Sequence, residues 1–109
     1  MKILVCPDSF KGTLSAARVA DVISDVLRKN IPEAKVAPLP LADGGEGTLD
    51  VVMKATGGGL QFCENVTGPF LNMRTEAPIG WIPGSRTAVL EMARTSGLAL
   101  VKPPERDPL

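Results

Sequence analysis

The chain has 109 residues, of which 44% are hydrophobic and 22% are charged, a composition that favours a folded globular protein over a disordered one. Twelve Lys and Arg residues balance twelve Asp and Glu residues, so the zero net charge gives no electrostatic reason to expect a nucleic acid or a membrane as partner. The absence of histidine and tyrosine excludes a Ser-His-Asp or Cys-His catalytic unit and leaves acid–base chemistry to Asp, Glu or Lys.

The two cysteines, Cys6 and Cys63, have no metal-binding spacing, and two thiols are too few for a structural zinc site without histidine. The apolar run at residues 3–5 is too short for a signal peptide or a membrane span. These features predict a cytoplasmic protein with reduced thiols.

In chain order, residues 2–6 are a short β-branched run that predicts a buried strand, and residues 7–12 form the loop after it. Residues 15–30 predict a helix, capped by Thr13 or Ser15. Its apolar positions have the spacing of one helical face: Val19, Val22, Ile23, Val26 and Leu27.

A second strand is predicted at residues 34–39, followed by the loop 41–48 and a helix at Thr48–Thr56 that glycines 57–59 end. The order strand, helix, strand, helix implies a parallel sheet with crossover helices, the beginning of a Rossmann-like α/β fold.

The pattern changes after Gly59. Residues 60–66, 73–81 and Thr87–Leu90 predict three short strands in an antiparallel meander, followed by a short helical segment at 91–97. We therefore expect a first domain at residues 1–59 and the start of a second, β-rich domain at residues 60–109. Neither part is complete as a domain, so we expect further sequence or a second copy of the chain to cover them.

The segment 43–48, DGGEGT, holds three glycines beside two carboxylates, ahead of a predicted helix: Asp43, Gly44, Gly45, Glu46, Gly47 and Thr48. Glycines let backbone N–H groups approach a ligand, and the amino end of a helix favours anions. The carboxylates agree with phosphate binding if a divalent cation lies between them and the phosphates, or they accept hydrogen bonds from substrate hydroxyls. The alternative is a tight turn in which Asp43 or Thr48 caps the helix.

Asp8, Ser9 and Lys11 lie in the loop 7–12, which follows the first strand. Ligands of open α/β sheets bind beyond the carboxyl ends of the strands, so this loop and segment 43–48 are expected at the same edge. A lysine, carboxylates and a glycine-rich backbone there suit phosphoryl transfer. The alternative is a loop that satisfies its own backbone. The segment 91–97, EMARTSG, is a third candidate, in which Arg94 is expected to face a phosphate or carboxylate, against the alternative of a short amphipathic helix with solvated charges.

Five stretches in this order and spacing resemble the N-terminal region of the bacterial glycerate kinase family: PDSFKG, LPLADGGEGT, ATGG, VTGP and TAVLEMARTSGLALV. The resemblance implies transfer of the γ-phosphate of ATP to D-glycerate with Mg²⁺. It also implies two α/β domains with the active site between them, the first Rossmann-like and built from both ends of the chain, the second inserted within it.

The resemblance carries the family's first motif onto Asp8, Ser9 and Lys11, and its second onto residues 43–48. Catalytic roles are expected for Asp8, Lys11, Asp43 and Glu46, with Asp43 and Glu46 contacting glycerate hydroxyls or metal and Lys11 facing carboxylate or phosphate. Substrate or phosphate contacts are expected for Ser9, Gly44, Gly45, Gly47 and Thr48. Asp8, Asp43 and Glu46 are the candidate magnesium ligands.

Members of the family are several times longer than this chain, so the resemblance implies an N-terminal portion of the enzyme. The alternative is a non-catalytic, self-associating module that binds a small anion at its glycine-rich loop. Both alternatives leave homo-oligomerisation open, because an incomplete sheet exposes strand edges that tend to pair.

Overall fold

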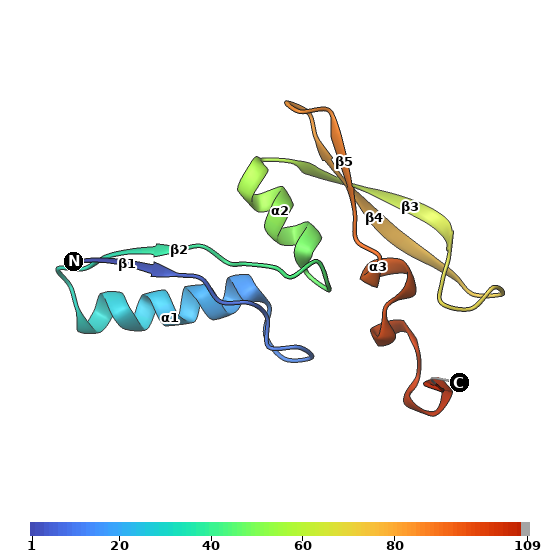
Figure 1. The fold of residues 1–109 in the computed structure, drawn as a ribbon, viewed down its shortest axis with the longest axis horizontal. Helices are drawn as coiled ribbons and strands as arrows, with labels where there is room; N and C mark the ends of the chain where they lie inside the picture. The colour runs from blue at the N-terminus through green and yellow to red at the C-terminus, as the bar shows by residue number, and fades with distance from the viewer. Residues whose placement is uncertain (108–109) are drawn as a thin grey trace. The chain divides into compact units, whose positions relative to one another are not determined.

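A computed structural model describes residues 1–107, which form five strands and three α-helices (Figure 1). In chain order these are β1 (Lys2–Val5), α1 (Ala16–Asn30), β2 (Lys35–Pro38), α2 (Thr48–Thr56), β3 (Gly59–Thr67), β4 (Arg74–Ile82), β5 (Thr87–Leu90) and α3 (Ala93–Ser96). Two 3₁₀ turns follow, Leu98–Leu100 and Pro103–Glu105. These elements pack into two compact units, residues 1–43 and a second unit that begins at Gly44.

In the first unit, β1 and β2 pair in parallel, from Lys2 opposite Lys35 to Val5 opposite Pro38, and α1 connects them. The hydroxyl of Ser15 caps α1 by accepting a hydrogen bond from the backbone N–H of Arg18 at 3.3 Å, which settles the choice between the two predicted caps. The predicted parallel pair with a crossover helix is confirmed.

The face of α1 that is buried differs from the predicted face. The buried residues are Ala16, Val19, Ala20 and Ser24, whereas Val22, Ile23 and Val26 are 43%, 39% and 56% exposed. Small side chains at positions 16, 20 and 24 let the helix approach the strands closely, so this flank of a broad apolar stripe is the one that packs. Two strands are too narrow to cover the other flank as well.

The second unit is an antiparallel sheet in the order β3-β4-β5, as the meander predicts, with α2 packed on β4. Leu49 and Met53 of α2 and Ala77 of β4 are its buried apolar residues, at 0%, 5% and 4% exposure. The contact is close at Gly80: a Cβ there would lie 2.6 Å from Cδ1 of Leu49 and 2.7 Å from Sδ of Met53. The helix can seat at this depth because position 80 carries no side chain.

A parallel pair followed by an antiparallel sheet confirms the α/β class. The compact units divide after Asp43, whereas the domain boundary is predicted near Gly59. The division describes the packing of residues 1–107, so the boundary at residues 59/60 stays a prediction, and its end at Pro108 and Leu109 lies outside the described residues. Within the described part of the chain, no helix is long and apolar enough to span a membrane.

Candidate functional site

The loop after β1 is a tight turn. The backbone N–H of Phe10 donates to the carbonyl of Leu14 at 2.9 Å, and that of Thr13 donates to the carbonyl of Phe10 at 2.8 Å. Asp8 accepts the backbone N–H of Ser9 at 2.6 Å. The loop therefore satisfies much of its own backbone, as the structural alternative predicts, while the carboxylate of Asp8 and the ammonium of Lys11 remain exposed.

Lys11 and Asp43, taken from the two predicted motifs, lie together in the first unit. Backbone hydrogen bonds continue the parallel pairing past the strands, from the N–H of Leu39 to the carbonyl of Val5 at 2.8 Å and from the N–H of Leu41 to the carbonyl of Pro7 at 2.9 Å. The two segments therefore leave the sheet side by side, and Nζ of Lys11 comes within 3.7 Å of Oδ2 of Asp43.

The Lys11–Asp43 pair is open to solvent, because the two side chains are 78% and 54% exposed. An ion pair so exposed adds little to stability, since water and salt screen it. The pair lies at the carboxyl end of two parallel strands, the usual location of ligand sites in open α/β sheets.

The glycine-rich segment begins the second unit. Gly44 and Gly47 have φ angles of 94° and 91°, which only glycine adopts without strain, and the N–H of Thr48 donates to the carbonyl of Gly45 at 3.2 Å. No atom lies within 4 Å of where a Cβ would be at either glycine, so backbone conformation, not space, requires them. The turn leaves the side chain of Glu46 exposed.

The amino end of α2 is capped by Glu91, which belongs to the third candidate segment, 91–97, but was given no role of its own there. Gly47 is the N-cap and has no side chain to offer. Instead the N–H of Gly47 donates to Oε1 of Glu91 at 3.1 Å, and the N–H of Leu49 donates to Oε2 at 2.8 Å. Neither Asp43 nor Thr48 is the cap. The protein's own carboxylate thus occupies the place where a phosphate was expected, and the predicted ligand roles of Gly47 and Thr48 stay predictions.

Arg94 is half-buried and lies beside two carboxylates, and its predicted role as an anion ligand stays a prediction. Its Nη2 contacts Oδ2 of Asp50 at 2.5 Å and its Nε lies 3.3 Å from Oε1 of Glu91. The second contact is an ion pair without hydrogen-bond alignment, since Nε of Arg94 has no hydrogen-bond partner among residues 1–107. The arginine therefore balances the buried carboxylate and ties it to the first turn of α2.

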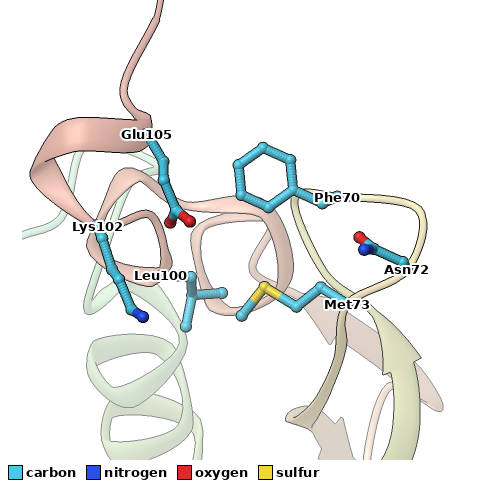
Figure 2. Close-up of a pocket in the computed structure, with 6 residues that line it drawn as sticks. All are labelled: Phe70, Asn72, Met73, Leu100, Lys102 and Glu105. Atoms are coloured by element: carbon cyan, nitrogen blue, oxygen red, sulfur yellow. The ribbon is translucent and has the colours of Figure 1, made fainter.

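No group of three or more acidic or cysteine side chains in the described residues is arranged to hold a metal ion. A hollow of about 290 Å³ in the second unit is lined by Phe70, Asn72, Met73, Leu100, Lys102 and Glu105 (Figure 2). None of the predicted site residues lines it, so the hollow is separate from the glycine-rich turn.

Comparison with known proteins identifies one family. The profile of the glycerate kinase family matches residues 3–109. The chain is 44% identical over 109 residues to the glycerate kinase of Haemophilus influenzae, and 44% identical over 109 residues to the glycerate 2-kinase of Escherichia coli K12. Each alignment covers 100% of this chain and 28% of the relative, so the chain spans little more than a quarter of the length of these curated relatives.

A solved structure shows the same relation. A crystal structure from Salmonella typhimurium LT2, whose description names glycerate kinase 2, superposes with a TM-score of 0.75 at 48% identity. The match covers 100% of this chain and 29% of that one.

Proposed function

The chain belongs to the glycerate kinase family, and we propose that the protein containing it transfers the γ-phosphoryl group of ATP to D-glycerate, giving phosphoglycerate and ADP. The observation that carries the proposal is the family match over residues 3–109, which includes both predicted motifs. The Lys11–Asp43 pair at the carboxyl ends of β1 and β2 supports it, because a cation and a carboxylate stand there together.

Phosphoryl transfer asks a protein mainly for positioning and for neutralisation of charge. In the proposed reaction a glycerate hydroxyl oxygen forms a bond to the γ-phosphorus, and the bond from that phosphorus to the bridging oxygen of ADP breaks. The hydroxyl proton passes to a carboxylate, for which Asp43 and Asp8 are the candidates. Lys11 offsets the negative charge of the glycerate carboxylate or of the phosphates.

The remaining predicted ligands have supporting roles. Glu46 accepts a hydrogen bond from a glycerate hydroxyl, and Ser9, Gly44 and Gly45 are candidates for contacts with phosphate oxygens. The amide of Gly47 already donates a hydrogen bond to Glu91 at 3.1 Å, so a phosphate could bind this amide only if that hydrogen bond broke. Gly44 is therefore the stronger candidate for a backbone contact.

Magnesium is part of the proposal, with Asp8, Asp43 and Glu46 as candidate ligands. These carboxylates suit the usual coordination of Mg²⁺, which takes one or two carboxylates from the protein and its other ligands from phosphates and water. When bound, magnesium supplies positive charge to the phosphates of ATP.

The relative from Escherichia coli is named for phosphorylation at the 2-hydroxyl, and we take the same hydroxyl as the proposed acceptor here. Cytoplasmic location belongs to the proposal too, because both Cys6 and Cys63 are free thiols.

The test uses the protein expressed from its whole reading frame, in steady-state assays of ADP release with MgATP and D-glycerate. We expect release that saturates with D-glycerate and is absent with 3-hydroxypropionate, which lacks the 2-hydroxyl. Release independent of D-glycerate, or none at all from folded protein, would contradict the proposal. An absence of ADP release from folded protein, together with a dimeric or larger mass in solution, would favour the non-catalytic, self-associating alternative.

A further inference from the structure

Glu91 is the one charged residue that is buried in the described part of the chain. Its side chain is fully shielded from solvent, and the residue as a whole is 5% exposed. It lies between β5 and α3, whereas the amides that it accepts from, Gly47 and Leu49, are 44 and 42 positions earlier in the chain. Two parts of the second unit that are distant in sequence are thus joined by a single carboxylate.

A carboxylate removed from water is strongly unfavourable unless other groups replace its hydration. Here both oxygens are satisfied by backbone donors, the amino end of α2 adds its positive dipole, and Nε of Arg94 lies 3.3 Å away. Since Gly47 has no side chain with which to cap the helix, removal of Glu91 would leave two N–H groups without an acceptor from the protein.

The contact also restrains the segment that precedes α2. Gly47, which follows Glu46 directly, is held through its amide at a φ of 91°. Arg94 forms a second connection to the same helix turn through Asp50. The backbone from Gly47 to Asp50 is therefore held at two amide groups by Glu91 and at the side chain of Asp50 by Arg94.

We propose that Glu91 is a positioning residue: by binding the amides of Gly47 and Leu49 it holds the glycine-rich turn in the conformation that presents Glu46 to substrate. Glu91 touches neither substrate nor phosphate in this account, and Arg94 keeps its carboxylate in place. The inference rests on the proposed function for its catalytic consequence, while the restraint of the turn is independent of it.

The test compares Glu91→Gln with Met53→Ala in the whole-frame protein. Glutamine preserves the shape but sets an N–H₂ donor against one of the two amides. Met53, 5% exposed on the same helix, lies against Gly80 of β4 and makes neither of the two amide contacts, so its truncation loosens the packing of α2 and leaves those hydrogen bonds in place. Activity is measured as the kcat of the folded fraction, and the restraint as hydrogen exchange of a peptide covering residues 44–50.

We expect Glu91→Gln to lower kcat by roughly 10- to 100-fold, the effect of misplacing a catalytic group, and to speed exchange in peptide 44–50. Met53→Ala should keep kcat within about threefold of the parent protein. A Glu91→Gln variant with parental kcat, or one that loses no more than Met53→Ala, overturns the proposal.

If the parent protein does not phosphorylate D-glycerate, the proposed function fails, and exchange alone then tests the restraint: unchanged exchange in Glu91→Gln overturns it, whereas faster exchange supports it. If Glu91→Gln does not fold, Arg94→Gln replaces it in the test. The Arg94 side chain is 35% exposed, so its substitution disturbs the packing less than that of the buried Glu91. A kcat drop of at least threefold in folded Arg94→Gln supports the proposal, and an unchanged kcat overturns it.

Discussion

The seating of α2 on β4 can be tested at Gly80. A methyl group there would lie 2.6 Å from Cδ1 of Leu49 and 2.7 Å from Cε and Sδ of Met53, well inside the 3.4 Å at which ordinary van der Waals contact begins. Leu49 is 0% exposed and Met53 is 5% exposed, so neither side chain has free space into which to move. Gly80→Ala should therefore destabilise the second unit by about 1 to 3 kcal/mol, as overpacking usually does.

Hydrogen exchange of the amides in β4 and α2 measures this loss in place. Since about 1.4 kcal/mol corresponds to a factor of ten in an opening equilibrium, protection should fall by roughly 5- to 150-fold. Gly84→Ala is the matched control, because a Cβ at Gly84 meets nothing within 4 Å. Adding Met53→Ala to Gly80→Ala should give a smaller loss than the two single changes together. Equal protection in Gly80→Ala and Gly84→Ala would refute the close contact.

Substitutions at three other residues give further predictions. Asp43→Asn should lower kcat at least about 100-fold as a lost proton acceptor, with unfolding by urea unchanged because the side chain is 54% exposed; near-normal turnover would remove Asp43 from the mechanism. Ser15→Ala should lower the free energy of unfolding of the first unit by about 1 kcal/mol through loss of the cap on α1, whereas Ser15→Asp should keep it; equal stability of the two variants would exclude the cap. Ser24→Ala should raise the free energy of unfolding of the first unit by about 1 kcal/mol, since the buried hydroxyl has no hydrogen-bond partner within residues 1–107. A loss of stability would show that the hydroxyl has a partner.

Local signals predicted the elements well where they are strong. The helix Thr48–Thr56 was predicted with the observed ends, because Gly57 supplies the left-handed C-cap, with a φ of 67°, that glycine favours. The meander was predicted from turn residues and lies within one residue of the observed strands at each end.

The buried flank of α1 could not be predicted, since periodicity defines an apolar stripe but not which side of it meets the sheet. Val22 and Val26 match the helical period as well as Val19 does, yet only Val19 is buried. The choice depends on how closely Ala20 and Ser24 let the strands approach, which is a property of the packed unit.

The part of the candidate site that involves long-range contacts was missed for the same reason. A glutamate after a strand is usually solvated, and nothing local links Glu91 to a turn more than forty residues earlier. A usable signal was present at Gly47, where a helix begins without a residue that can cap it. An uncapped helix start invites a search for an acidic residue elsewhere in the chain.

The central claim is that the protein containing this chain phosphorylates D-glycerate, and phosphorus NMR of one reaction tests it most directly. The protein expressed from its whole reading frame, with MgATP and D-glycerate, should produce a phosphomonoester resonance that coincides with that of added 2-phosphoglycerate. An equal amount of ADP should form. A resonance of 3-phosphoglycerate would show that the 3-hydroxyl is the acceptor, and the assignment as a kinase would stand. Consumption of ATP to ADP and inorganic phosphate alone, or no consumption by folded protein, would contradict the account.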